Sequence, residues 1–225
     1  MTGGLPRLAV LASGRGSNLQ AILDAIARGG LEAEVVGVFS DKPGCEALSR
    51  VDETRRWSRD AGAYADRAGF DADLGDAIAA THPDWIVCAG YMRILGDGFL
   101  ARFAGRTLNI HPSLLPKFRG LRTHARAIKA REREHGASVH FVVPELDAGA
   151  VVAQAVVPVH PGDSADMLAE RVLQREHPLL LATLRLAVAG RLAERDGRAW
   201  LDGHPLFKPL RLSSADVFIE PPRHP

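Results

Sequence analysis

The 225-residue chain has little of several features that mark particular classes of protein. It contains two cysteines, Cys45 and Cys88, without CxxC spacing, so a disulfide scaffold is excluded. Its 28 Lys and Arg residues are balanced by 27 Asp and Glu residues, a net charge of +1 that argues against a nucleic-acid groove or an anionic membrane surface as partner. The apolar run at residues 8–12 is too short for a signal sequence or a membrane span. We therefore expect a cytoplasmic protein.

Metal-binding patterns are also lacking. The nine histidines include no pair at i, i+4 with an accompanying glutamate, so we expect no metal site. What the chain does have is 46% hydrophobic and 24% charged residues, close to the average of globular proteins. A chain of this length and composition can bury a full core.

The first half of the sequence alternates short apolar runs with helical patterns. Strands are predicted at residues 7–13, 34–40, 85–89 and 107–111, and the first is followed by a glycine turn and a helix that ends near residue 29. Strand, helix and strand in this order form a right-handed crossover unit. The sequence thus predicts an α/β fold: a single domain with an open, mostly parallel, Rossmann-like sheet flanked by helices.

The second half predicts antiparallel additions to this sheet. Strand patterns cover residues 137–143 and 151–159, a long amphipathic helix covers 164–189, and a hairpin turns at 195–197. Residues 41–73 are less regular, with a short helix expected after Pro43 and a short strand near Trp57. A helix over 74–80 follows this segment. Five prolines after residue 203 predict a loosely ordered tail at 204–225, which leaves the folded domain at 1–203.

A glycine loop, Ser-Gly-Arg-Gly-Ser-Asn, occupies residues 13–18 between the first strand and the first helix. The free amides and the positive dipole end at Gly16, Ser17 and Asn18 suit a phosphate, whereas the alternative is a tight turn with a helix cap. Leu19 stands where a dinucleotide fingerprint needs its third glycine, so a mononucleotide or sugar phosphate fits better than NAD. Asp41 remains conceivable as a ribose-binding acid.

Two polar residues share one face at the end of the predicted strand 107–111. Asn109 and His111 are two positions apart, so they point to the same side of the sheet. A carboxamide beside an imidazole can donate hydrogen bonds to a developing oxyanion, and histidine can transfer a proton near neutral pH. The alternative is a structural histidine before Pro112.

Asp147 lies in the turn Glu-Leu-Asp-Ala-Gly at residues 145–149. A plain turn aspartate is the default interpretation at such a position. A functional role requires that Asp147 approach His111, where its charge would raise the pKa of the imidazole.

These motifs, in this order, resemble the phosphoribosylglycinamide formyltransferases, which are folate-dependent enzymes of purine synthesis. The resemblance extends from about residue 7 to about residue 200. The matching segments are 13–20 (SGRGSNLQ), 90–95 (GYMRIL), 108–117 (LNIHPSLLPK), 135–140 (HGASVH), 145–149 (ELDAG) and 174–177 (QREH).

The resemblance implies a reaction and a role for each catalytic residue. The amine of N1-(5-phosphoribosyl)glycinamide would attack the formyl carbon of 10-formyltetrahydrofolate to give a tetrahedral intermediate. Asn109 and protonated His111 would hold the oxyanion, His111 would donate a proton, and Asp147 would raise the pKa of His111.

The resemblance also assigns the two ligand sites, with small molecules as partners and a monomer or homodimer as the assembly. The substrate phosphate would bind the amides of Gly16, Ser17 and Asn18, with Glu176 nearby. The residues implied for the folate are Arg67, Met92, Arg93, Ile94, Leu95, Asn109, His140 and Val142.

Other folate enzymes and two other classes are the alternatives. Methionyl-tRNA formyltransferase would need an added RNA-binding C-terminal domain and a more basic surface. 10-Formyltetrahydrofolate hydrolase carries an N-terminal regulatory domain and lacks the loop at residues 14–18. An NAD-linked oxidoreductase is disfavoured by the incomplete fingerprint. A non-enzymatic nucleotide-binding module would tolerate replacement of Asn109 and His111.

Overall fold

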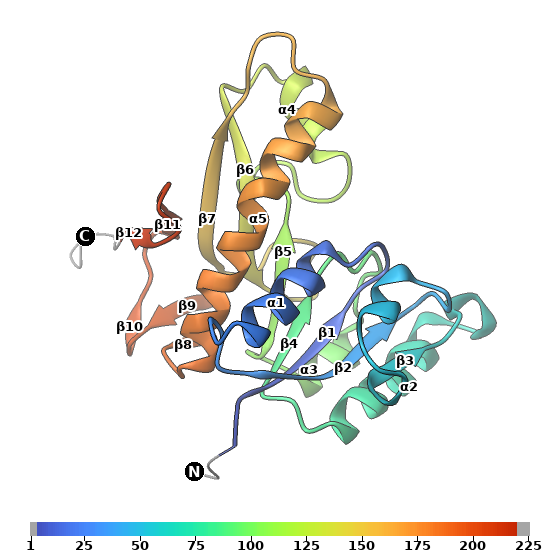
Figure 1. The fold of residues 1–225 in the computed structure, drawn as a ribbon. Helices are drawn as coiled ribbons and strands as arrows, with labels where there is room; N and C mark the ends of the chain where they lie inside the picture. The colour runs from blue at the N-terminus through green and yellow to red at the C-terminus, as the bar shows by residue number, and fades with distance from the viewer. Residues whose placement is uncertain (1–3, 220–225) are drawn as a thin grey trace. The chain divides into compact units, whose positions relative to one another are not determined.

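The structure, a computed structural model, describes residues 4–219. The chain divides into two compact units, Met1–Asn109 and Ile110–Pro225. Figure 1 shows the elements of both units.

The N-terminal unit is built on a parallel sheet with the strand order β5-β4-β1-β2-β3. Residues Leu8–Leu11 in β1 are completely buried, as expected for a central strand covered on both faces. Because β1 pairs with β4 on one side and β2 on the other, the strand order reverses there, and the loops after β1 and β4 lie at a topological switch point. The strands are β1 (Arg7–Leu11), β2 (Glu34–Ser40), β3 (Arg56–Ser58), β4 (Trp85–Cys88) and β5 (Thr107–His111), the last of which continues into the second unit.

The first helix ends at Ala27, close to its predicted end near residue 29, whereas the second helix begins earlier than predicted. The helix predicted at 74–80 starts at Arg67, because the Asp66 side chain accepts a hydrogen bond from Gly69 N at 2.8 Å and caps it. The short helix expected after Pro43 is a 3-10 turn. The helices are α1 (Ser17–Ala27), α2 (Arg67–Ala80) and α3 (Asp97–Arg102), with 3-10 turns η1 (Glu46–Arg50), η2 (Glu53–Arg55) and η3 (Ala61–Ala63).

The C-terminal unit combines an antiparallel pair of strands with a long helix. Strands β6 (Glu134–Phe141) and β7 (Val151–Pro158) pair antiparallel, and α5 (Ala165–Val188) packs along them (Figure 1). The shorter helix α4 (Thr123–Lys129) contacts α5. The apolar face of α5 is fully buried at Leu168, Val172, Leu179, Leu180 and Leu184.

Small strands complete this unit. The predicted hairpin is formed by β8 (Leu192–Arg195) and β9 (Arg198–Leu201), with β10 (His204–Pro205) beside β9. Strand β11 (Leu210–Leu212) pairs parallel with β7, and β12 (Phe218–Ile219) pairs with β11. Residues 204–219, expected to be loosely ordered, thus form short strands, because β11 bonds to the edge of β7 and buries two leucines. Residues 220–225 of the expected tail lie outside the described part.

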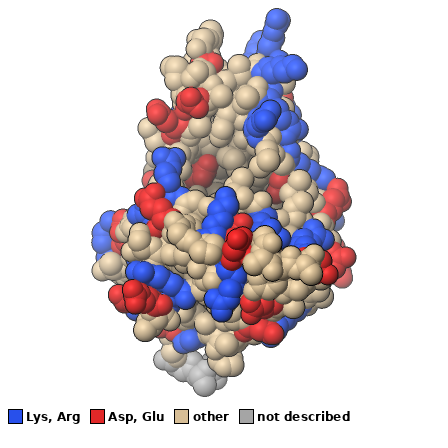
Figure 2. All heavy atoms as spheres, turned by 90° about the vertical axis from the view of Figure 1, so that its right-hand side faces the viewer, with Lys and Arg blue, Asp and Glu red and all other residues tan. Residues whose placement is uncertain are grey.

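Charge on the surface follows the balanced composition. Figure 2 shows Lys and Arg side chains interspersed with Asp and Glu over the visible face. Between residues 4 and 219 no helix is both long enough and apolar enough to cross a membrane.

Candidate active site

A buried carboxylate between two histidines lies in the C-terminal unit. Asp147 follows β6 in a turn with a left-handed backbone, φ 48°, which aspartate tolerates better than most residues. Its Oδ2 atom accepts a hydrogen bond from Gly120 N at 2.8 Å and lies 3.4 Å from His111 Nδ1. Its Oδ1 atom lies 3.6 Å from His140 Nε2. We call these three side chains the Asp147 cluster; the approach of Asp147 to His111 that a functional role requires is present.

Both ring nitrogens of His111 face oxygen acceptors. Nε2 lies 3.1 Å from the carbonyl oxygen of Phe118, and Nδ1 faces Asp147. Only the imidazolium can donate to both. Burial nevertheless lowers the pKa of His111, and this effect exceeds the opposing effects of the Asp147 charge and the Phe118 carbonyl. Asp147 therefore acts in the expected direction, but the net pKa of His111 falls below its ordinary value of 6.5.

The carboxylate itself stays ionised. Burial alone would raise the pKa of Asp147, but hydrogen bonds from His140 and Gly120 and the proximity of His111 lower it to about 2. The cluster thus holds a fixed negative charge beside an imidazole that burial makes a stronger acid.

A buried hydrogen-bond network holds the loop that meets His111. The Ser138 hydroxyl donates to Ser113 O at 2.7 Å and accepts from Leu115 N at 3.0 Å. The Gln154 amide donates to Leu115 O at 2.9 Å and to Ser138 Oγ at 3.0 Å. These bonds fix residues 113–115, three residues before Phe118. The sequence reasoning assigned no role to Ser138 or Gln154, although Ser138 shares the face of β6 that carries His140.

The glycine loop, residues 13–18, is held through its carbonyl groups. Gly14 O accepts hydrogen bonds from Ala47 N and Cys45 Sγ, both at 3.1 Å, and Arg15 O accepts from Arg50 Nε at 2.8 Å. The N-cap residue of α1 is Gly16, which has no side chain to cap the helix. The positive end of the helix dipole lies at this loop.

Gly16 cannot be replaced without strain in this loop. Its φ is 74°, and a Cβ atom there would lie 2.7 Å from Ala47 Cβ. Arg15 is exposed. Asp41, considered as a ribose-binding acid, is buried and accepts a hydrogen bond from Ser13 Oγ at 2.6 Å.

The loop after β4, residues 90–96 (the β4 loop), lies in the same unit. Met92 and Ile94 are exposed, and Leu95 is buried. The guanidinium of Arg93 lies 4.9 Å from the centre of the Phe70 ring. Arg67 Nε lies 3.7 Å from the position of a Cβ at Gly96, so the structure brings Arg67 to the end of this loop.

Comparisons with known proteins identify the family of this chain. The sequence profile described as formyl transferase matches residues 6–184. The chain belongs to the formyl transferase family. Over 201 residues it is 44% identical to the phosphoribosylglycinamide formyltransferase of Escherichia coli (strain K12), covering 88% of this chain and 95% of that relative.

Solved structures of a formyltransferase and of a deformylase are similar to the fold of this chain. The phosphoribosylglycinamide formyltransferase of Coxiella burnetii, solved in complex with CHES, has a TM-score of 0.84 at 40% identity over 90% of this chain and 96% of that one. A formyltetrahydrofolate deformylase of Pseudomonas syringae pv. tomato has a TM-score of 0.79 at 25% identity, covering 88% of this chain and 66% of that one. The resemblance, the α/β fold class and the expectation of an enzyme of this kind are confirmed.

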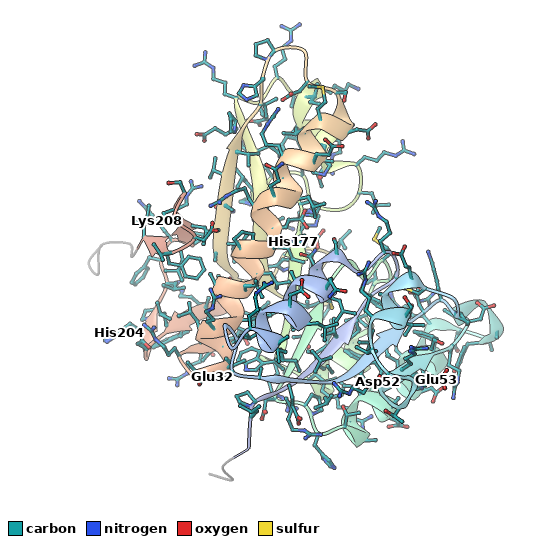
Figure 3. The ribbon with its side chains drawn as sticks, in the orientation of Figure 1. Glu32, Asp52, Glu53, His177, His204 and Lys208 are labelled. Atoms are coloured by element: carbon teal, nitrogen blue, oxygen red, sulfur yellow. The ribbon has the colours of Figure 1, made fainter. Side chains whose placement is uncertain are left out.

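The remaining expected site residues of this formyl transferase lie on three elements. Asn109 is on β5, two residues before His111, and is partly buried. Val142 follows β6, two residues after His140, and Glu176 is on α5. Next to Glu176, His177 also comes from α5 (Figure 3). Burial lowers the pKa of His177, and its Nε2 has no hydrogen-bond partner among residues 4–219.

Metal ligation finds no support in the described part of this formyl transferase. Residues 4–219 contain no group of three or more His, Cys, Asp or Glu side chains that could hold a metal ion. The expectation of no metal stays a prediction.

A second histidine pair makes the stability of this formyl transferase depend on pH. His135 is buried, with Nε2 3.2 Å from His124 Nδ1, and burial lowers its pKa to about 4 from an ordinary 6.5. Because the folded pKa is depressed, stability present above pH 6.5 is lost as pH falls towards 4. Between pH 7 and pH 5 we expect this group to cost about 2 kcal/mol of unfolding free energy. Urea titrations at both pH values measure it.

Two variants separate this effect from general acid sensitivity. His135→Gln cannot titrate and should lose less stability between pH 7 and pH 5 than the unmodified chain. The exposed His160 is the matched control, and His160→Gln should lose as much as the unmodified chain. Equal losses in the two variants would contradict the assignment.

Proposed function

We propose that this formyl transferase transfers the formyl group of 10-formyltetrahydrofolate to the glycinamide amine of N1-(5-phosphoribosyl)glycinamide. The observation that carries the proposal is the ionised Asp147 carboxylate beside the buried His111. The identity of 44% to an enzyme named for this acceptor supports the choice of substrate.

The chemistry needs a stabilised oxyanion and a proton donor. The amine attacks the formyl carbon, and the resulting tetrahedral carbon carries a negative oxygen. Asn109 and the His111 imidazolium donate hydrogen bonds to this oxygen. As the bond from carbon to N10 of the folate breaks, His111 supplies a proton to N10. The proton released by the attacking nitrogen passes to the neutral imidazole and restores His111.

The environment of His111 fits this role. Burial makes the imidazolium a stronger acid, and Asp147 remains charged and stabilises it when it forms. In the free protein the Phe118 carbonyl lies at Nε2, so His111 exchanges this contact for the substrate when Nε2 donates.

We assign the ligand sites from the glycine loop, from the β4 loop and from the segments of this sequence that match the family. The amides of Gly16, Ser17 and Asn18 at the N-terminus of α1 hold the phosphate of the ribonucleotide. Glu176 is assigned to the same ligand site because its segment, residues 174–177, matches the family. The residues proposed for the folate are Arg67, Met92, Arg93, Ile94, Leu95, Asn109, His140 and Val142.

We also propose small molecules as the partners, a monomer or homodimer as the assembly, a cytoplasmic location and no metal. The alternative function is hydrolysis of 10-formyltetrahydrofolate, which the likeness to a deformylase keeps in view. The glycine loop at the N-terminus of α1 favours transfer, because a hydrolase has no second substrate whose phosphate the loop would bind.

Replacing His111 tests the proposal directly. His111→Ala removes the proton donor and one oxyanion donor, so kcat for formyl transfer should fall by about 10²–10³ or more. The affinity for the ribonucleotide should stay within about threefold, because its phosphate is held elsewhere. A transfer assay with 10-formyl-5,8-dideazafolate and calorimetric titration of the ribonucleotide measure the two effects.

The exposed His160 provides the control for this experiment. His160→Ala should keep the activity of the unmodified chain. Full activity in His111→Ala would exclude the proposed catalytic role of His111.

Asp147→Asn tests the electrostatic part of the mechanism. The amide still accepts the hydrogen bond from Gly120, but it no longer raises the pKa of His111. Since His111 acts as an acid, the alkaline limb of the pH dependence of kcat/KM should move to lower pH, with a lower maximum.

Glu145 is a matched control in the same turn, because it is exposed and pairs with Arg119. Glu145→Gln should leave the pH profile in place. An unchanged profile in Asp147→Asn would separate Asp147 from proton transfer.

Gly16→Ala tests the phosphate site. The positive φ and the contact at 2.7 Å with Ala47 force the loop to shift, and the Kd for the ribonucleotide should rise by about tenfold or more. Gly14→Ala is the control, since a Cβ there meets no atom within 4 Å. Isothermal titration of both variants with the ribonucleotide compares them, and equal affinities would remove the loop from the phosphate site.

A further inference from the structure

The β4 loop is fastened at both of its ends by buried side chains of the N-terminal unit. At its start, Ser13 N donates to Gly90 O at 3.1 Å, and the Ser13 hydroxyl accepts from Met92 N at 2.9 Å. At its end, Asp71 Oδ2 accepts from Gly96 N at 2.7 Å. Ser13 and Asp71 are 7% and 5% exposed, so water competes little for these bonds.

Asp41 orients the first of these fastenings. A carboxylate accepts hydrogen bonds, so the Ser13 hydroxyl donates its proton to Asp41 Oδ1 at 2.6 Å. A lone pair of the Ser13 hydroxyl oxygen is then directed at Met92 N. Asp41 is 7% exposed, so the whole chain of bonds from Asp41 to Met92 is buried.

The bond from Gly96 N to Asp71 requires a residue without a side chain at position 96. A Cβ at Gly96 would lie 2.8 Å from Asp71 Oδ2, so a side chain there would displace the carboxylate. Burial raises the pKa of Asp71, whereas the Gly96 amide and the charges of Arg67 and Arg93 lower it. Asp71 therefore also faces the two arginines proposed for the folate.

Three buried polar atoms at this loop have no hydrogen-bond partner within residues 4–219. They are Asp71 Oδ1, Tyr91 Oη and Arg93 Nε. Buried polar atoms in native proteins are nearly always bonded, to protein, water or ligand. The surroundings of the β4 loop therefore contain polar groups that a bound ligand or water can satisfy.

We propose that Ser13 and Asp71 are positioning residues that hold the β4 loop in the shape that binds the folate donor. Ser13 therefore acts on folate binding although it belongs to the glycine loop assigned to the phosphate. The inference rests on the proposed function, because that function assigns Met92–Leu95 to the folate. Neither side chain needs to touch a reacting atom.

The test compares the binding of the two ligands in matched variants. Ser13→Ala and Asp71→Ala should each raise the Kd for 10-formyl-5,8-dideazafolate by about tenfold, the usual effect of losing a buried hydrogen bond. Their Kd for the ribonucleotide should change by less than about threefold. Asp71→Asn and Asp41→Asn each keep an acceptor oxygen at the substituted position. Both should therefore retain most of the folate affinity of the unmodified chain.

Two controls account for general effects of the substitutions. Ser40→Ala removes a buried hydroxyl next to Asp41 that binds Lys42 N and not the β4 loop. Asp76→Ala removes an exposed acid of α2 that pairs with Arg102. Both should bind the folate analogue like the unmodified chain. If Asp71→Ala does not fold, Gly96→Ala tests the same fastening, with Gly98→Ala, which meets no atom within 4 Å, as its control.

The outcomes separate this inference from the proposed function. Normal folate affinity in Ser13→Ala and in Asp71→Ala or Gly96→Ala would overturn the positioning role while the unmodified chain still transfers formyl groups. Equal losses of affinity for both ligands would also overturn it, because they would indicate a general loss of structure. An unmodified chain that neither binds the folate analogue nor transfers formyl groups would instead refute the proposed function.

Discussion

A carboxylate that remains charged while it is buried constrains the C-terminal unit. The Asp147 side chain is 9% exposed, and taking its charge out of water is costly unless donors surround it. The Gly120 amide and two histidines supply them. The turn that delivers Asp147 passes so close to Phe141 that a Cβ at Gly149 would lie 1.9 Å from the Phe141 carbonyl oxygen, so this position accepts only glycine.

The same burial acts in opposite ways on the two members of the pair. For His111 it dominates and lowers the pKa, whereas for Asp147 the hydrogen bonds dominate and lower the pKa to about 2. Protonated His111 therefore releases its proton readily, and the ionised Asp147 beside it does not take the proton up. General acid catalysis uses the protonated imidazole of His111, which the Asp147 charge favours and burial disfavours.

Local sequence patterns predicted the elements that carry the site, but not the bonds between distant segments. The predicted bounds of β2 and β5 agree with the structure, because both are short segments rich in apolar and β-branched residues, which favour strands. The sequence does not predict the bond from Ser13 to Asp41, because nothing near Asp41 points to a hydroxyl 28 residues away. The tail strands were missed because the proline content is local, while the pairing of β11 with β7 spans more than fifty residues.

Within the N-terminal unit, the switch point between β1 and β4 brings the glycine loop and the β4 loop together through Ser13. Whether this formyl transferase uses a phosphorylated amine as acceptor can be measured by the absorbance change of 10-formyl-5,8-dideazafolate with and without N1-(5-phosphoribosyl)glycinamide. We expect loss of the formyl donor that requires the ribonucleotide and is stoichiometric with its formylated product. Donor loss at the same rate without the ribonucleotide would contradict it and indicate a hydrolase.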